Sequence, residues 1–365
     1  MSHAFARRRT AVLGLAFVAS AALLAGCSAT PAPTASLAPG ETASGTLVVS
    51  TFPFGVEEFQ QAIVDPFEEA TGITVELDTG SNADRLNKLE LNGDNAGIDV
   101  MLISDFYAAM GQDKDLFEQV DADLVPNLDS IADFAKSDEF TGPSYSYQLN
   151  GVMYRTDEID AEQAASWDLY ADTDYTGRLA FPDISTTGGQ LSVTAVADTY
   201  GDDAYDIDTS LKTIGEWAPN ILQFVASSTE ITNLITQGEI VASPILNGFA
   251  TSLVASGEPL AWTATDTGKY MTTNRAMIPA GSQNTEAASE FINYLLSVEA
   301  QTASAEIVGD LPVNPEATVP SSLTDVVGDI AADPAAAGFE TLDFATIVTN
   351  YDDWVDRFAR EVTTK

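Results

Sequence analysis

Histidine and cysteine, the residue types most used in nucleophilic catalysis and zinc binding, are almost absent from this chain. Its 365 residues include one histidine, His3, and one cysteine, Cys27, both near the N-terminus. A Ser-His-Asp triad, a Cys-His pair and a His or Cys zinc site all need these side chains inside the folded body. The sequence therefore excludes these chemistries for the body, and it predicts no disulfide framework.

Carboxylates are the catalytic groups that the chain has in abundance. Asp and Glu number 55 against 15 Lys and Arg, which gives a formal charge of −40. A glycosidase needs a pair of facing carboxylates. With so many acidic residues such pairs arise by chance, so they do not indicate an enzyme. We therefore expect no enzyme and no cofactor. A nucleic-acid partner is also excluded, because binding to a phosphate backbone needs a basic surface.

Polar and aromatic residues follow the strands that we expect in the first part of the chain. These strands cover residues 46–50, 73–77 and 98–103, and open α/β sheets bind ligands beyond the carboxyl ends of their strands. The phenylalanines fit an aromatic wall or a core, and the Ser, Asn and Asp residues fit ligand contacts or helix N-caps. The expected ligand contacts are Thr51, Phe52, Phe54, Ser81, Asn82, Asp105, Phe106 and Tyr107.

The second part of the chain offers a comparable set of loop residues. They follow expected strands at 179–181 and 240–246, or lie where the chain crosses back at 270–274. Small hydroxyl residues and glycines at a helix N-terminus let backbone N–H groups approach a ligand. The expected contacts here are Asp183, Ser185, Thr186, Thr187, Asn247, Tyr270 and Asn274.

The elements that must position these residues alternate between strands and helices. The helix expected over 56–71 places Phe59, Ile63 and Phe67 on one face, and further helices are expected at 190–200, 210–224, 228–237 and 352–362. Such alternation implies parallel βαβ units and an α/β fold. Near residue 145 the pattern changes, and YSYQLNGVMYR (145–155) reads as one long strand.

The N-terminus has the pattern of an export signal. Arg7 to Arg9 precede the apolar run 11–24, which is shorter than a membrane span of about 20 residues and fits a signal peptide. Leu-Ala-Gly-Cys (24–27) resembles a bacterial lipobox, which implies a lipid on Cys27; ordinary cleavage with a spare thiol is the alternative. We expect a signal peptide at 1–26 and a flexible linker, rich in Ala, Thr, Pro and Ser, at 27–45.

Six phrases follow one another along the chain: PFEEATGITVEL (66–77), SNADRLNKL (81–89), GIDVMLISDFYAAM (97–110), LNGVMYR (149–155), LITQGEIVASPILNG (234–248) and LPVNPEA (311–317). This ordered set resembles type 2 periplasmic binding proteins of ABC importers, in their spermidine/putrescine- and ferric-ion-binding branch. The resemblance implies an α/β fold of two lobes with two crossing hinge strands. Lobe 1 takes residues 46–148 plus 275–365, and lobe 2 takes 149–274.

The same resemblance implies a function and a location. It implies that the chain is a monomeric solute-binding lipoprotein, held by its lipid anchor on the extracytoplasmic face of the cell membrane. It captures a small solute between its lobes and delivers the solute to an ABC permease and its ATPase. A lipid-anchored sensor with the same fold is the alternative.

The resemblance favours a polyamine-like or other organic cation as the solute, and aromatic side chains can stack on such cations. Asn274 departs from this pattern, because it falls where polyamine binders carry an amine-fixing Asp. Ferric binders usually show adjacent tyrosines and often a histidine, and the body has neither, although oxygen ligands alone can hold a hard cation. Ferric ion, a thiamine-like cation and a phosphonate therefore stay open as alternatives, and no metal site is assigned.

Overall fold

The structure is a computed structural model that describes residues 45–136 and 139–364. The predicted signal peptide (1–26) with Cys27, and the predicted linker up to residue 44, lie outside the described residues.

The first sheet is built from parallel strands that return through helices. β1 (Thr46–Thr51) pairs in parallel with both β2 (Thr74–Thr79) and β3 (Val100–Ser104). β3 is buried along its whole length, as expected for a strand whose two faces are covered by helices. The connecting helices are α1 (Val56–Phe59), α2 (Asp65–Thr71), α3 (Asn82–Asn92) and α4 (Asp105–Asp113).

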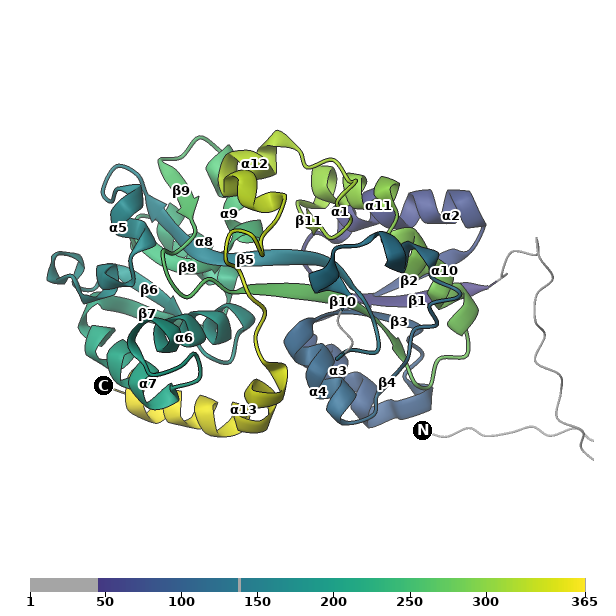
Figure 1. Cartoon of the computed structure of the whole chain (residues 1–365), viewed down its shortest axis with the longest axis horizontal. Coiled ribbons are helices and arrows are strands. Elements are labelled where there is room, and N and C mark those ends of the chain that lie inside the picture. Colours follow the sequence, from purple (N-terminus) through teal and green to yellow (C-terminus); the bar gives the residue numbers. More distant parts are fainter. Residues whose placement is uncertain (1–44, 137–138, 365) are drawn as a thin grey trace, which may run out of the picture. The chain divides into compact units, whose positions relative to one another are not determined.

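Two long strands, β5 (Ser144–Arg155) and β10 (Met271–Pro279), link this sheet to a second one (Figure 1). With β6 at Leu179–Pro182, β7 at Ile221–Val225 and β8 at Ala242–Leu246, the strand order is β2-β1-β3-β10-β5-β8-β6-β7. The first half of β5 pairs antiparallel with β10, and its second half pairs with β8 (Ala242–Leu246) and β9 (Leu260–Thr263). The predicted α/β class and the predicted crossing strands are confirmed.

The second sheet contains β6 (Leu179–Pro182), which pairs in parallel with β7 (Ile221–Val225) and β8. The helix predicted over 210–224 is wrong at its end. It stops at Trp217, because Pro219 cannot donate the backbone hydrogen bond that a continuing helix needs, and β7 follows. The helices of this part are α5 (Ala161–Ala165), α6 (Thr187–Tyr200), α7 (Ile207–Trp217), α8 (Ser228–Thr236) and α9 (Asn247–Ala255).

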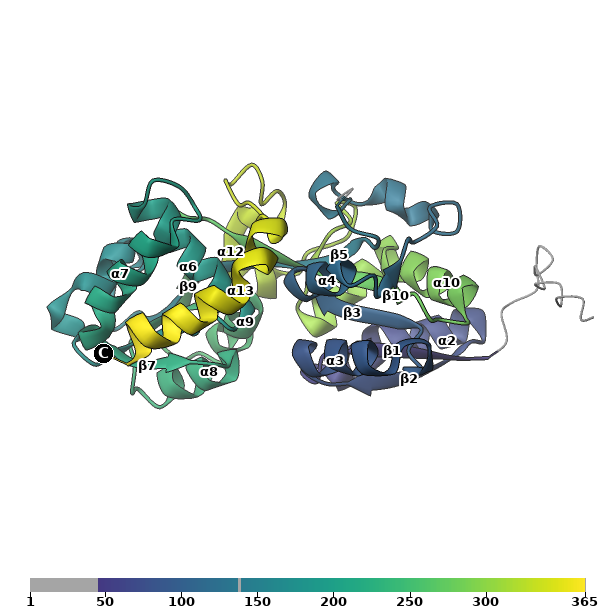
Figure 2. The same ribbon diagram turned by 90° about the horizontal axis from the view of Figure 1, so that it is seen from below.

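The C-terminal elements do not all pack on the first sheet. α10 (Thr285–Leu295) contacts β10, α11 (Val298–Ala303) contacts α10, and the short strand β11 (Leu311–Pro312) pairs with β5. In contrast, α12 (Ser321–Val327) contacts α9, and α13 (Phe344–Phe358) contacts both α4 and α7 (Figure 2). The predicted lobe boundaries stay a prediction, but residues 321–358 touch helices that the sequence assigned to lobe 2.

Below, "first lobe" means the elements around β1–β3 and "second lobe" those around β6–β8. Within the described ranges, no helix is both long and apolar enough to cross a membrane.

Candidate functional site

A cleft of about 280 Å³ lies where the two lobes and the crossing strands meet. The first lobe contributes the ends of β1 and β3, the start of α3 and the loop before β11. The second lobe contributes the N-terminal ends of α6, α8 and α9. Tyr145, Gln148, Thr272 and Asn274 of the crossing strands also line the cleft.

Several of the residues singled out from the sequence do line this cleft. They come from loops that directly follow strands or that open helices, and Asn274 comes from the crossing strand β10. Their contact with a ligand remains a prediction, but the structure brings them together in one cavity. They are Thr51, Phe52, Phe54, Asn82, Thr186, Thr187 and Asn274.

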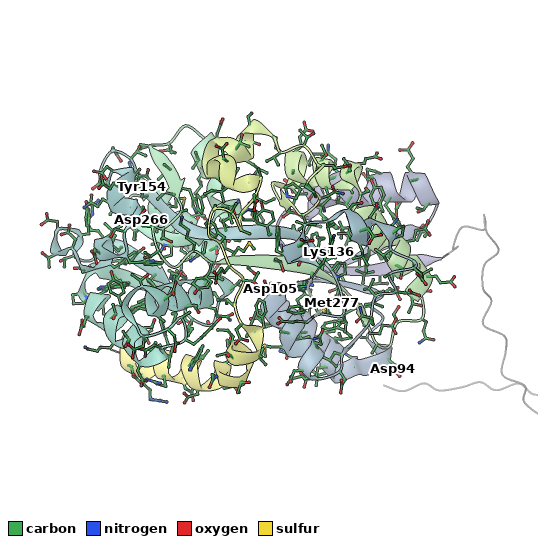
Figure 3. The ribbon with its side chains drawn as sticks, in the orientation of Figure 1. Asp94, Asp105, Lys136, Tyr154, Asp266 and Met277 are labelled. Atoms are coloured by element: carbon green, nitrogen blue, oxygen red, sulfur yellow. The ribbon has the colours of Figure 1, made fainter. Side chains whose placement is uncertain are left out.

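Asp105, Phe106 and Tyr107 lie outside the cleft, because α4 turns them into the protein. Asp105, labelled in Figure 3, is 1% exposed and accepts hydrogen bonds from the Thr273 N–H (2.7 Å) and the Thr272 hydroxyl (2.8 Å). Burial raises the pKa of its carboxyl. Phe106 is fully buried, and its ring contacts that of Tyr107 at 5.0 Å. These residues tie α4 to the crossing strand β10.

The remaining predicted contacts have local structural roles and do not line the cleft. Ser81 caps α3 by accepting the Asp84 N–H, and Asp183 accepts the Ser185 N–H. Asn247 is fully buried, and its Oδ1 accepts the Leu149 N–H at 2.7 Å. Tyr270 is 5% exposed and forms a backbone bridge with Glu340. For Ser81 the N-cap alternative is therefore the one that the structure shows.

Asp310 is the carboxylate of the cleft, and sequence reasoning missed it. Gly309 precedes it with φ of +87°, a left-handed conformation that ends η8 (Ser304–Val308) and turns the chain into the cleft. Among the described residues, Ser304 alone donates a side-chain or backbone hydrogen bond to it, at 2.9 Å to Oδ2. Burial raises the pKa of this carboxyl to about 6. Asp310 therefore offers acceptor capacity and negative charge that the protein does not use.

Gln148 adds a second acceptor that the sequence did not reveal. Its side-chain oxygen Oε1 is buried and has no hydrogen-bond partner within the described part of the chain. A Cβ atom on Gly248 would lie 2.9 Å from Oε1, so a larger residue at this position would require the Gln148 amide to shift. A buried acceptor without a partner costs roughly 1–3 kcal/mol, and a donor on a bound solute removes that cost.

Arg85 holds the first-lobe wall of the cleft together. It is 2% exposed and donates to the carbonyl oxygens of Ser50 (3.2 Å) and Leu102 (2.7 Å), and to the side-chain oxygen of Asn82 (2.9 Å). Its guanidinium carbon lies 5.0 Å from the centroid of the Phe52 ring. One side chain thus fixes the ends of β1 and β3 and two lining residues.

Helix N-termini form much of the second-lobe wall. The Thr186 hydroxyl caps α6 by accepting the Gly189 N–H at 3.0 Å. Ser227 precedes α8 without a side-chain capping bond. The first N–H groups of a helix are unpaired and carry partial positive charge. This wall therefore suits a negatively charged or carbonyl-like part of a solute.

An aromatic contact joins the lobes at the cleft. Phe54 of the first lobe, 68% exposed, lies with its ring centroid 5.7 Å from that of Phe249 in α9. Both residues line the cleft. In residues 45–136 and 139–364, no group of three or more His, Cys, Asp or Glu side chains is placed to hold a metal ion.

Comparison with known proteins decides the family. The model of the bacterial extracellular solute-binding protein family matches residues 62–338, well over half of the chain. The chain belongs to this family. The resemblance to the solute-binding component of an ABC importer, stated from the sequence, is thereby confirmed. The family consists of solute-binding receptors and is not an enzyme family.

The curated relatives of this solute-binding protein cover about three quarters of it. It is 23% identical over 278 residues, 74% of this chain and 77% of the relative, to spermidine/putrescine-binding periplasmic protein 1 of Haemophilus influenzae. It is 24% identical over 275 residues, 72% and 77% of the two chains, to a putative 2-aminoethylphosphonate-binding periplasmic protein of Salmonella typhi.

A solved structure of an ABC transporter protein from Clostridium perfringens aligns with a TM-score of 0.74 and 27% identity, covering 87% of this chain and 99% of that one. The predicted fold, a two-lobed α/β protein of the type 2 periplasmic-binding class, is confirmed.

Proposed function

We propose that this protein captures a small solute carrying an ammonium group in the cleft between its lobes and delivers it to an ABC permease. The observation that supports an ammonium group is the Asp310 carboxylate, which lines the cleft and receives a hydrogen bond only from Ser304 among the described residues. A charge-assisted hydrogen bond to such a carboxylate is about twice as strong as a neutral one. The Gln148 oxygen offers a further acceptor for the same N–H donors.

Aromatic side chains support the same proposal. Phe52, Phe54 and Phe249 line the cleft and present rings to a bound solute. An ammonium group over such a ring gains about 0.5–2 kcal/mol, with the larger value in a desolvated site. The relative from Haemophilus influenzae is named for spermidine and putrescine, which carry amines. We therefore place a polyamine or a related organic cation first.

A solute that carries an anionic group beside its ammonium is the second candidate. The second-lobe wall contains the N-terminal ends of α6 and α8, which attract negative charge. Asp310 lies in the first-lobe wall, so opposite charges of one molecule can contact different lobes. The Salmonella relative named for 2-aminoethylphosphonate binds, by its name, a molecule of this kind.

The proposed cycle is closure of the lobes around the solute. The first lobe is assigned to 46–148 plus 275–365, and the second to 149–274, with β5 and β10 as the hinge. A solute that contacts both walls favours the closed form over the open one. Closure then presents the surface that the permease recognises.

A thermal-shift screen tests the proposal. Putrescine, spermidine, 2-aminoethylphosphonate, thiamine and ferric citrate are added separately to the mature protein. At about 100 times its dissociation constant, a specific solute stabilises the folded state by roughly 2.7 kcal/mol. We expect the stabilising compound to carry an ammonium group. A shift with ferric citrate or thiamine alone, or none with any of them, contradicts the proposal.

We further propose that the mature protein is a monomeric lipoprotein attached through Cys27 on the extracytoplasmic face of the membrane. The support is the Leu-Ala-Gly-Cys sequence at 24–27 behind an apolar run. Replacing Cys27 with alanine removes the thiol that accepts the lipid, so we expect the protein to move from the membrane fraction into the medium or periplasm. Cell fractionation measures this, and membrane retention of the variant contradicts the anchor.

A further inference from the structure

Tyr351 of the C-terminal helix α13 contacts both lobes beside the cleft. Its ring centroid lies 4.9 Å from that of Phe106 in α4. Its hydroxyl interacts with the Tyr107 hydroxyl of the same helix. The same hydroxyl donates to the Ser185 carbonyl oxygen, at 3.3 Å, in the loop that precedes α6. Through Tyr351, these contacts link α4 to the loop before α6. The next residues of that loop, Thr186 and Thr187, line the cleft.

The rest of α13 repeats this pattern of contacts with both lobes. Near its start, the Phe344 ring lies 5.5 Å from that of Phe140, which precedes β5. Near its end, the Phe358 ring centroid lies 5.5 Å from that of Phe224 in β7. An Arg357 nitrogen lies 2.6 Å from the carboxylate of Asp208, in the first turn of α7. In Figure 2, α13 runs along the second lobe and its first turn lies beside α4.

These contacts constrain any motion about the hinge. If the lobes separate while α13 stays on α7, the contacts of Tyr351 and Phe344 with Phe106, Tyr107 and Phe140 must break. None of these side chains lines the cleft, so a solute does not replace the lost contacts. The free energy of these contacts therefore changes with the movement of the lobes itself, before any solute is present.

We propose that Tyr351 is a positioning residue that holds the loop before α6, at Ser185, against α4 and so stabilises the arrangement of the lobes seen here even without solute. The proposal rests on the proposed function for its effect on binding, but its effect on the solute-free protein is independent of any solute. If the solute binds this arrangement, a protein that already populates it pays less of the free energy of lobe movement on binding.

The test uses the mature protein and Tyr351→Phe, which removes the hydroxyl and keeps the ring on Phe106. Tyr294→Phe is the matched control, since Tyr294 lies in α10 and its ring packs on Phe67, away from the cleft. Hydrogen–deuterium exchange without solute is measured over residues 183–190. We expect faster exchange there in Tyr351→Phe by about three- to tenfold, the size of one hydrogen bond, and no change in Tyr294→Phe.

Binding of putrescine and 2-aminoethylphosphonate provides the second readout. For whichever of them binds the wild type, we expect Tyr351→Phe to raise the dissociation rate by a similar factor and to leave the association rate nearly unchanged. If neither compound binds, the proposed function fails, while the exchange result still decides the role of Tyr351. The proposal is overturned if residues 183–190 exchange at the same rate in Tyr351→Phe as in the wild type. It is also overturned if exchange rises equally over the whole chain.

A double-mutant cycle gives the sharpest check. Tyr107→Phe removes the partner hydroxyl on α4. If the two hydroxyls act in one chain, the effects of Tyr107→Phe and Tyr351→Phe on exchange over 183–190 are not additive. Additive effects overturn the link between α4 and the loop.

Discussion

Replacing Asp310 with asparagine is expected to weaken binding of an ammonium-bearing solute at pH 8 by about 30-fold or more. Truncating one partner of a buried charge pair commonly costs about 2–5 kcal/mol, and 1.4 kcal/mol is about tenfold in affinity. The asparagine keeps the shape of the side chain and an acceptor for the Ser304 hydroxyl, so the loss reports the charge. Isothermal titration with putrescine measures it.

Glu306→Gln is the matched control for this prediction. Glu306 is exposed, lies four residues before Asp310 in η8 and does not line the cleft, but its replacement removes the same charge. We expect it to change affinity by less than about twofold, because an exposed charge at a distance is screened by salt. Equal losses in the two variants would mean that the overall negative potential, and not Asp310, attracts the solute.

Asp310 also makes binding depend on pH. Burial raises the pKa of its carboxyl to about 6, so the carboxylate is charged above that pH and protonated below it. We expect affinity for putrescine to be constant above about pH 7 and to fall by up to about tenfold per pH unit below pH 6, with a much flatter profile in Asp310→Asn.

The stability of the solute-free protein depends on the ionisation of Asp310 in the opposite direction. Ionisation of this half-buried group opposes folding, so the free energy of unfolding decreases as pH rises from 3.8 toward about 6.

The loops that follow the first-lobe strands could be predicted because their positions depend on local pattern. A buried strand, a break at Pro53 or Gly80 and a helix signal are all visible in the sequence. Parallel strands end at one edge of a sheet, so Thr51, Phe52 and Asn82 were expected close together, and they share one cleft.

Side-chain direction at a strand–helix junction could not be predicted in the same way. Asp105 to Tyr107 stand at the correct edge, but contacts with β10 and α13 decide which way they turn. Phe106 contacts Tyr351, a residue 245 positions later in the chain. Such a contact leaves no trace in the local spacing of apolar residues.

Asp310 was missed for a related reason. It is one of 55 acidic residues, and its own neighbours do not mark it as buried. Its partial burial comes from η8, which packs against α1 and η1 (Gln60–Val64) at the other end of the chain. The one local signal is Gly309, whose positive φ turns the chain, and a glycine before an acid is too common to single out a site.

Replacing Arg85 with alanine is expected to lower the free energy of unfolding by about 3–5 kcal/mol, the range for breaking a buried polar network. Four acceptors lose their donor: the carbonyl oxygens of Gly80, Ser50 and Leu102 and the side-chain oxygen of Asn82. Burial lowers the pKa of Arg85 to about 10, so the guanidinium stays charged at neutral pH and the variant also removes a buried charge.

The same substitution is expected to weaken solute binding, because Arg85 joins the strand ends that carry Phe52 and Asn82. Denaturant unfolding measures the stability, and titration well below the denaturation midpoint measures binding in the folded fraction. Arg360→Ala, at an exposed position of the C-terminal segment, is the control and should change the unfolding free energy by less than about 0.5 kcal/mol. Since Arg85 does not line the cleft, a loss of affinity in a variant that remains folded shows that it acts through the loops it holds. If Arg85→Ala is as stable as the wild type, water or another donor replaces the guanidinium. The first-lobe wall would then not depend on Arg85.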